Sequence, residues 1–300
     1  MDADAGRVLV TGATGFVGRH VARRLGASRT VRALVRQPAS VDGATEMVLG
    51  DVTRQDTLRD AVRGVEAIVH CVAITGNLKE AHPGQYDEVN RGGTENLVHA
   101  AVEAGVKRVV LLSGLGTKPA PASTYMSTRW GMEEAVRGSG LPFAILRPSV
   151  QFGDGAEFVA AFARLARSSP VVPLLGGGSL RFQPIWVEDV VTCVEKCLAE
   201  DRLLGAEHTI GGSEQLTLRE LIEAICATLG KRRVLAPLPL AVAAAQARLM
   251  SRLMARPPLT PATIELFGFD NVTDLDAVDR TFGFHPRGFR EYLAERGVEA

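Results

Sequence analysis

Three regularly spaced glycines directly after a short apolar run constrain the fold of this sequence more than any other feature. The run is Arg7–Thr11, and Gly12, Gly15 and Gly18 follow it within Thr-Gly-Ala-Thr-Gly-Phe-Val-Gly. The residues after the turn have helical periodicity as far as Leu25. Glycine allows a tight turn between a strand and a helix. The sequence therefore predicts that a βα unit begins the fold.

The same alternation of short apolar runs and longer helical segments continues to Arg147. It is typical of βαβ units around a parallel sheet, and the β-branched apolar runs suit strands buried on both faces. The sequence thus predicts an α/β fold with a doubly wound parallel sheet. Its strands are expected at Arg7–Thr11, Val31–Val35, Glu46–Leu49, Ala67–Cys71, Arg108–Leu112 and Pro142–Arg147. The helices between them are expected at Gly15–Leu25, Gln55–Val62, Gln85–Ala104 and Thr124–Arg137.

The glycine turn is a variant of the fingerprint that binds the pyrophosphate of a dinucleotide. Without side chains the backbone can approach the phosphates, whose charge is met by unpaired N–H groups and the positive end of the helix dipole. At the first βα turn of an alternating fold, the spacing predicts an NAD or NADP site rather than a purely structural turn. The expected contacts are Gly12, Thr14, Gly15, Phe16, Val17 and Gly18.

Arg36, eighteen residues beyond Gly18, follows the second predicted strand. NAD-specific proteins place an acidic residue there for the ribose hydroxyls, whereas a guanidinium can bind a 2′-phosphate through two hydrogen bonds. NADP(H) is therefore favoured over NAD(H). A solvated surface arginine is the alternative, since Arg32 and Arg54 are also nearby.

Two further strand ends fit a dinucleotide site, because ligands bind at the carboxyl ends of strands in open α/β sheets. Asp51, followed by Val52, comes after the third strand and could accept a hydrogen bond from the adenine amino group. An acid at a helix N-terminus is the alternative for Asp51. Small side chains follow the fourth strand and could line the pyrophosphate and ribose: Cys71, Val72 and Ala73.

A smaller region is expected after residue 150, where glycines and prolines interrupt the alternation. We expect residues 1–150 to form the NADP-binding Rossmann domain, with return segments at about 180–200, and residues 151–300 to form the substrate side. The expected elements there are a strand at Phe182–Trp186, a helix at Val190–Ala199 and a helix at Thr217–Leu229. Thr217 and Glu220 form a capping box at the start of the last helix.

The segment Leu235–Met254 is strongly apolar, but Pro237, Pro239 and Arg248 interrupt it. No transmembrane segment is therefore expected. We interpret the segment as a buried helix of the smaller region. A surface for a partner or a lipid is the alternative.

Charge and cysteine content exclude several classes of protein. The formal net charge is zero with interleaved acids and bases, so nucleic acid is not an expected partner. The short acidic start, Met1–Gly6, leaves no room for a signal peptide, which predicts a cytoplasmic protein. Cys193 and Cys197 lie four apart, but nothing at ligand spacing completes a metal site, so we expect reduced cysteines packed in the core and no metal.

Several motifs together resemble the extended and atypical short-chain dehydrogenase/reductases, which are NAD(P)-dependent epimerase/dehydratase-like proteins. The motifs are the glycine turn, Gly50-Asp51-Val52, Asn90-x-x-Gly-Thr94-x-Asn96-Leu, Tyr125 and Leu146-Arg147-Pro148-Ser149. The chain is most similar to the subgroup that contains the NADPH-binding accessory subunit of respiratory complex I and its free-standing bacterial relatives. The resemblance covers nearly the whole chain, and its early motifs are the more specific ones.

The resemblance implies a catalytic Tyr-x-x-x-Lys pair, in which tyrosine transfers a proton to or from the substrate oxygen and lysine holds the nicotinamide ribose. Residues four apart share a helix face, so the pairing is geometrically reasonable. Tyr125 is present, but Arg129 stands at the lysine position. Arginine keeps the charge and presents its donors differently. The alternative is a surface ion pair of Arg129 with Glu133 and a Tyr125 that only packs under the cofactor.

The resemblance also implies a substrate-activating hydroxyl just beyond the fifth strand. Ser113 is the nearest candidate, while Gly114 and Leu115 stand where the hydroxyl lies in many relatives. Asn90 is expected on the long helix beneath the site, where its amide orders a water or a backbone group or has a purely structural partner. The turn after the sixth strand is implied to border the nicotinamide: Pro148, Ser149 and Val150.

Two functions are compatible with these residues. One is an oxidoreductase or epimerase that moves hydride between nicotinamide and a carbonyl or alcohol carbon of a small-molecule substrate. The other is a non-catalytic NADP(H)-binding accessory or redox-sensing protein that acts through a protein partner. The presence of Tyr125 favours the first function. The second is favoured by Arg129 at the lysine position and by Gly114 and Leu115 where many relatives have the hydroxyl. The late segments are too apolar for a typical nucleotide-sugar site, so an apolar substrate is expected, and a homo-oligomer is a further option.

Overall fold

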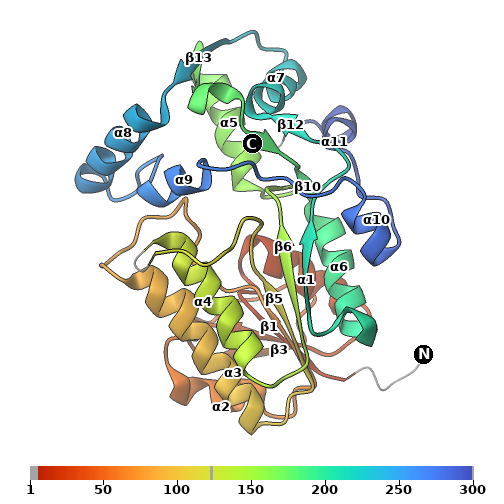
Figure 1. Cartoon of the computed structure of the whole chain (residues 1–300). Helices are drawn as coiled ribbons and strands as arrows, with labels where there is room; N and C mark the ends of the chain where they lie inside the picture. The colour runs from red at the N-terminus through yellow and green to blue at the C-terminus, as the bar shows by residue number, and fades with distance from the viewer. Residues whose placement is uncertain (1–5, 122–123, 299–300) are drawn as a thin grey trace. The chain divides into compact units, whose positions relative to one another are not determined.

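The computed structural model describes residues 6–121 and 124–298, which fall into two compact units (Figure 1). The described residues of Met1–Ile74, Glu80–Arg147 and Val191–His208 form the first unit. Those of Thr75–Lys79, Pro148–Val190 and Thr209–Ala300 form the second. Each unit is therefore assembled from segments that are far apart in the sequence.

A seven-stranded sheet forms the centre of the first unit, in the order β11-β6-β5-β4-β1-β2-β3. The six strands from β1 to β6 are parallel. Their bounds are β1 Val8–Thr11, β2 Val31–Val35, β3 Glu46–Leu49, β4 Ala67–His70, β5 Arg108–Leu112 and β6 Phe143–Pro148, and β11 is Ala206–Ile210. Strands β2 and β3 follow β1 on one side of it, and strands β4, β5 and β6 follow one another on the other side. The predicted doubly wound sheet is confirmed, and the point where the strand order reverses lies between β1 and β4.

Helices cover both faces of this sheet. Figure 1 shows α2 (Leu58–Val62), α3 (Gly93–Glu103) and α4 (Tyr125–Gly138) over one face. Strand and helix side chains form a buried core there, including Leu9, Ile68, Leu97, Leu111 and Met132. The opposite face carries α1 (Phe16–Leu25) and α6 (Val187–Ala199), which are joined by an ion pair from Arg24 to Glu195 at 3.2 Å. The inner strands β1, β2, β4 and β5 are thus largely buried on both faces, whereas the edge strand β3 leaves Met47 and Leu49 exposed.

The predicted helix Gln85–Ala104 has an irregular start. Its first part is a π-helical segment, η2 (Asp87–Gly92), and only α3 is a regular α-helix. Thr94 Oγ1 donates to the Asn90 carbonyl at 2.5 Å, so a side chain satisfies a backbone acceptor where the helical register changes. In the same way the predicted helix Gln55–Val62 begins as a 3₁₀ turn, η1 (Gln55–Thr57), before α2.

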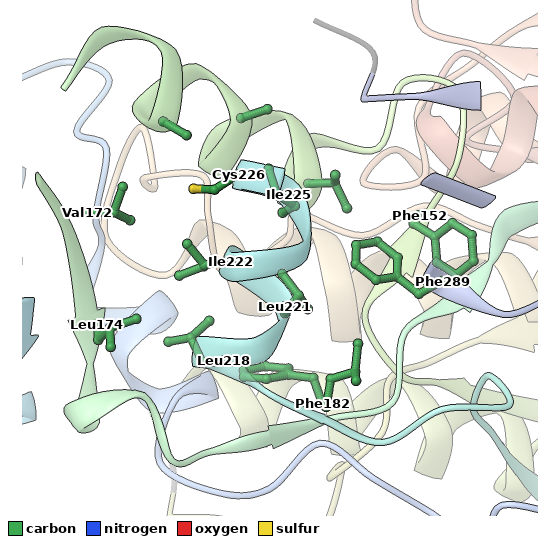
Figure 2. Packing of buried hydrophobic residues seen from close by; sticks show 14 of the residues in the cluster. Phe152, Val172, Leu174, Phe182, Leu218, Leu221, Ile222, Ile225, Cys226 and Phe289 are labelled. Atoms are coloured by element: carbon green, nitrogen blue, oxygen red, sulfur yellow. The ribbon is translucent and has the colours of Figure 1, made fainter. Parts of the chain in front are cut away.

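The second unit is built from short strand pairs and helices around its own apolar core. The strands pair as β7 (Gln151–Phe152) with β10 (Ile185–Trp186), β9 (Arg181–Phe182) with β12 (Leu216–Thr217), and β8 (Val171–Leu175) with β13 (Val234–Leu238). The helices are α5 Glu157–Ser168, α7 Leu218–Thr228, α8 Leu240–Leu253, α9 Pro261–Leu266, α10 Ala277–Phe282 and α11 Phe289–Arg296, and η3 (Gly176–Gly178) and η4 (Asp201–Leu203) are short turns. Figure 2 shows α7 in the core, where Leu218, Leu221, Ile222 and Ile225 contact strand and helix side chains.

Two predictions for this region need correction, and one is confirmed. The capping box of Thr217 and Glu220 is present at the start of α7. The predicted strand Phe182–Trp186 is instead two separate strands, because Pro184 has no N–H and the Gln183 side chain donates to the Gly212 carbonyl at 2.8 Å. The interruption lets neighbouring residues pair with different strands.

The predicted buried helix Leu235–Met254 is wrong in both extent and burial. Its first residues belong to β13, and the helix begins only after Pro239, which caps α8. Of the α8 residues, only Ala243 and Ala247 are buried. The rest of the helix is partly or fully exposed.

Cys193 and Cys197 are fully buried, which confirms their predicted place in the core. Among residues 6–121 and 124–298, no cluster of three or more His, Cys, Asp or Glu side chains is arranged to hold a metal ion. Every helix in the same ranges is too short or too polar to span a membrane.

Candidate dinucleotide site and reaction centre

The glycine turn connects β1 to α1 at the reversal of strand order. Gly12 has φ +69°, and a Cβ there would lie 2.9 Å from the carbonyl carbon of Cys71. A Cβ on Gly18 would lie 2.1 Å from the Gly12 carbonyl oxygen. Both close approaches require glycine. The turn is closed by the Gly15 N–H, which donates to the Gly12 carbonyl at 2.8 Å.

The start of α1 suits an anion. Gly15 is its N-cap, no side chain of the described residues caps it, and no acidic residue stands in its first turn. The amide groups at the start of a helix carry partial positive charge and need acceptors. A pyrophosphate is the kind of acceptor that this geometry can accommodate.

A buried polar chain holds the strand that leads into the glycine turn. His70 Nδ1 lies 2.6 Å from Thr11 Oγ1, and His70 Nε2 lies 3.0 Å from Thr94 Oγ1. Because Thr94 donates its only proton to the Asn90 carbonyl, His70 must donate through Nε2 and accept through Nδ1. Burial and the nearby Arg129 charge lower the pKa of His70 to about 3, so the ring is neutral at pH 7.

Sequence reasoning missed His70. The only signal was one histidine inside an otherwise apolar strand, Ala67–His70. A strand buried on both faces leaves a histidine no access to water, so it requires protein partners.

Arg36 follows β2 with an exposed side chain. It makes no hydrogen bond or ion pair with the residues that the structure describes. The two competing arginines are differently placed. Arg32 forms an ion pair with Glu46 at 2.7 Å, and Arg54 forms one with Asp56 at 3.1 Å. Of the three, Arg36 is the one whose guanidinium can bind a phosphate without losing a protein partner.

The strand ends beyond β3 and β4 present the other predicted cofactor contacts. Asp51 Oδ1 accepts from the N–H and the hydroxyl of Thr53, both at 2.9 Å. A carboxylate has further lone pairs, so Asp51 retains capacity for another donor. Val52 is buried, and Cys71, Val72 and Ala73 are partly exposed. Desolvation of its thiol by the surrounding protein raises the pKa of Cys71 to about 12, so the thiol is neutral at pH 7.

The side-chain amide of Asn90 forms hydrogen bonds with other groups of the protein. Its Oδ1 accepts from the Ile74 N–H at 2.8 Å, and its Nδ2 donates to the Ile74 carbonyl at 3.2 Å and to Thr128 Oγ1 at 3.1 Å. The amide therefore joins the segment after β4 to α4. These contacts are compatible with both predicted roles, and Asn90 stays a predicted site residue.

Tyr125 is the first residue of α4, and Arg129 lies one turn further along. Thr124 caps the helix by accepting from the Ser127 N–H at 3.1 Å. Tyr125 is only 8% exposed and Arg129 only 7%. The Arg129 guanidinium donates to the Leu112 carbonyl at 3.3 Å, and no carboxylate of the described residues pairs with it.

The expected alternative, a surface ion pair of Arg129 with Glu133, does not form. Glu133 is fully buried and accepts instead from Arg137 at 2.6 Å and from Arg147 at 2.5 Å. The pKa of Arg147 is raised, chiefly by its hydrogen bonds to Glu133. The buried carboxylate is thus neutralised without Arg129.

Ser113 follows β5 and is buried. Its hydroxyl donates to Glu133 Oε1 at 2.5 Å and lies 3.3 Å from Thr117 Oγ1. The serine proton is therefore directed at Glu133 rather than at a substrate. The contact joins β5 to α4 through the same carboxylate that receives the two arginines.

Tyr86 is a neighbour of Tyr125 that sequence reasoning missed. The two rings meet edge to face, with centroids 5.4 Å apart. Burial, Glu80 and Tyr125 raise the pKa of Tyr86 to about 12, so it is neutral at pH 7. The chain has only three tyrosines, and this low number was the one signal in the sequence that could have drawn attention to Tyr86.

The predicted nicotinamide turn belongs to the second unit, where Pro148 begins one of its segments. Ser149 Oγ donates to Asn271 Oδ1 at 2.7 Å, and the Val150 N–H donates to the same oxygen at 2.9 Å. Asn271 therefore fixes the conformation of this turn. It lies more than a hundred residues away in the sequence, so no local pattern indicated it.

Comparison with known proteins agrees with this geometry. The profile of a family described as NAD(P)H-binding matches residues 12–158. The chain is 31% identical to the (4-alkanoyl-5-oxo-2,5-dihydrofuran-3-yl)methyl phosphate reductase of Streptomyces griseus over 296 residues, covering 96% of this chain and 97% of that protein. It is 25% identical to the mitochondrial NADH dehydrogenase (ubiquinone) 1 alpha subcomplex subunit 9 of Arabidopsis thaliana over 276 residues, covering 89% of this chain and 68% of that protein.

A solved structure of MoeE5 in complex with UDP-glucuronic acid and NAD is similar with a TM-score of 0.74. The identity is 25%, and the match covers 96% of this chain and 97% of that one. The sequence and structural matches extend over nearly the whole chain. The protein therefore belongs to the NAD(P)-binding short-chain dehydrogenase/reductase family, among its extended, epimerase/dehydratase-like members.

Proposed function

We propose that this chain is an NADP(H)-dependent oxidoreductase that acts on a carbonyl or alcohol carbon of a small apolar substrate. The observation that carries the proposal is the buried Arg129 guanidinium, which lies one helical turn from Tyr125 without a carboxylate partner among the described residues. A buried charge is costly unless it is paired or serves a ligand. A reaction centre that must hold a ribose and activate a phenol accounts for it.

The residues of the first unit fit NADP. The absence of side chains at Gly12 and Gly18 leaves a cradle that a Cβ would fill, and the N-terminus of α1 can meet the pyrophosphate. Arg36 would bind the 2′-phosphate. Asp51 and Val52 would contact the adenine, with Cys71, Val72 and Ala73 beside the pyrophosphate and ribose. The turn at Pro148, Ser149 and Val150 is proposed to border the nicotinamide.

Proton transfer is assigned to Tyr125. When bound, the nicotinamide supplies or accepts the hydride. The Tyr125 hydroxyl would give a proton to the substrate oxygen during reduction and take it back during oxidation. The Arg129 guanidinium can hold a ribose hydroxyl. Ser113 receives no proton-transfer role here, because its proton is directed at Glu133.

Exchange of Arg36 for glutamate is expected to weaken NADPH binding by roughly 100-fold, because a charge-assisted contact to phosphate is replaced by repulsion. NADH, which lacks the 2′-phosphate, should lose no more than a few-fold. Titrations followed by nicotinamide fluorescence measure both. The matched control is Arg54→Glu, at an exposed arginine that already pairs with Asp56. If Arg36→Glu weakened the binding of NADPH and of NADH by the same factor, Arg36 would not contact the 2′-phosphate.

Exchange of Tyr125 for phenylalanine is expected to lower turnover by about 10²–10⁴-fold, the usual contribution of a general acid. NADPH affinity should stay the same, because the phenol proton is not needed to hold the dinucleotide. The assay is NADPH oxidation with a panel of apolar aldehydes and ketones. Tyr292→Phe in the second unit is the control and should leave turnover unchanged. If Tyr125→Phe kept the turnover of the wild type, a group other than Tyr125 would transfer the proton.

A second candidate function is a non-catalytic NADP(H)-binding protein that acts through a protein partner. The Ser113–Glu133 contact favours it, since it removes the hydroxyl that would otherwise activate a substrate. The Arabidopsis relative is itself named as a subunit of a larger enzyme. A wild-type chain that binds NADPH tightly and turns over no carbonyl compound would favour this function over the first.

A further inference from the structure

The segment 231–264 has a charge composition unlike the rest of this neutral chain. It contains no aspartate or glutamate. Its six basic residues are Lys231, Arg232, Arg233, Arg248, Arg252 and Arg256. The segment includes β13 and α8, so the positive charge is concentrated on one part of the second unit.

One side of α8 presents large apolar side chains to solvent. Val242 is 46% exposed, Leu249 58% and Leu253 76%. Their spacing of seven and four residues places them within about 40° of one another around the helix. Met254, which follows α8, is also exposed, at 43%. Scattered exposed aliphatic residues are ordinary, but a stripe along one helix marks an interaction surface.

The buried side of α8 differs from this stripe. Its fully buried residues are Ala243 and Ala247, and Leu240 packs against the core at the start of the helix, whereas Val242, Leu249 and Leu253 remain outside. A helix whose main role was to stabilise the core would also have Leu249 and Leu253 turned inward. The arrangement therefore indicates that the apolar stripe has a partner outside this chain.

Basic side chains flank the stripe. Arg248 and Arg252 are four residues apart and lie about 100° around the helix from it, and Arg256 follows beyond the helix end. All three are exposed, and none forms a hydrogen bond or ion pair with a described residue. Lys79 adds a fourth cation at this end, because its ammonium donates to the Met254 carbonyl at 3.2 Å. We call these four cations and the stripe the α8 surface.

We propose that the α8 surface binds the headgroup region of an anionic lipid membrane. An interfacial helix places an apolar stripe at the level of the acyl chains while flanking arginines contact anionic headgroups. Both halves of that pattern are present on α8. The described helices are too short or too polar to span a bilayer, so the contact is peripheral.

Charge complementarity decides against a second copy of the chain on this surface. A symmetric dimer through α8 would bring the Arg248, Arg252 and Arg256 side chains of two copies together, and the segment has no acid to offset them. An anionic lipid surface supplies both negative charge and an apolar interior.

Sedimentation with lipid vesicles tests the proposal on the full-length chain. We expect binding to vesicles of phosphatidylcholine mixed with phosphatidylserine, weakening as salt is raised, and at least tenfold weaker binding to phosphatidylcholine alone. The double exchange Arg248→Gln and Arg252→Gln should weaken binding to the anionic vesicles roughly thirty-fold. The double exchange Leu249→Gln and Leu253→Gln should weaken it by at least tenfold.

The control exchanges two arginines four apart elsewhere, Arg59→Gln and Arg63→Gln at α2, and should bind vesicles like the wild type. An NADPH titration of each variant checks that it is folded. Equal and weak binding to both kinds of vesicle would overturn the proposal. So would lipid-independent dimerisation that the leucine exchanges abolish, because it would assign the stripe to a second copy.

Discussion

Alanine at Gly18 is expected to abolish dinucleotide binding, with NADPH affinity falling by more than about 100-fold. A Cβ there would lie 2.1 Å from the Gly12 carbonyl oxygen and 3.0 Å from the Ala13 Cα. Both are backbone atoms, so the clash is relieved only if the turn opens and its N–H groups move away from the pyrophosphate. The result is measured by NADPH titration, with circular dichroism to show that the sheet has formed.

The control for this glycine is Gly138→Ala at the end of α4. A Cβ at Gly138 would meet nothing within 4 Å, and alanine is the better helix former, so NADPH affinity should be unchanged. A folded Gly18→Ala protein with wild-type NADPH affinity would show that the glycine turn does not hold the dinucleotide.

Exchange of Glu133 for glutamine is expected to lower the free energy of unfolding by about 3–5 kcal/mol, the usual cost of removing one partner from a buried ion pair. The carboxylate is fully buried and receives Arg137, Arg147 and Ser113. Glutamine keeps the size of the side chain but removes the buried carboxylate that Arg137 and Arg147 share, which leaves the two arginines only the more exposed carboxylates of Glu207 and Glu134. Urea unfolding of the variant and the wild type measures the difference.

The neighbouring residue supplies a matched control. Glu134 also pairs with Arg137, at 2.6 Å, but its side chain is 54% exposed. Glu134→Gln should therefore cost less than about 1 kcal/mol, as expected of a surface ion pair. If Glu133→Gln unfolded at the same urea concentration as Glu134→Gln, the buried ion pairs of Glu133 would contribute no more to the free energy of unfolding than the exposed ion pair of Glu134.

The sheet could be predicted from sequence because its signals are local. Val31–Val35, Glu46–Leu49 and Arg108–Leu112 are short apolar runs between turn signals, and the structure has strands with these bounds. The glycine turn is local as well, since strand, spacing and helix follow each other within twenty residues. The capping box at Thr217 could be recognised for the same reason.

The parts that could not be predicted depend on contacts between distant segments. The ion pair of Glu133 is an example. The spacing along the helix predicted Arg129 as its partner, whereas in the structure Arg147 of β6 pairs with it. The π-helical start around Asn90 depends on the segment after β4, which receives its amide. For α8, apolar composition predicted burial, but composition does not tell which side of a helix has a neighbour within the chain.

Titration of the wild-type protein with NADPH and with NADH, followed by nicotinamide fluorescence, is the direct test of the proposed dinucleotide site. The free Arg36 guanidinium and the open glycine turn predict saturable binding of both dinucleotides, with NADPH bound at least tenfold more tightly. Absence of binding by either dinucleotide would contradict the account, and the glycine turn would then have to serve the fold or a different anion.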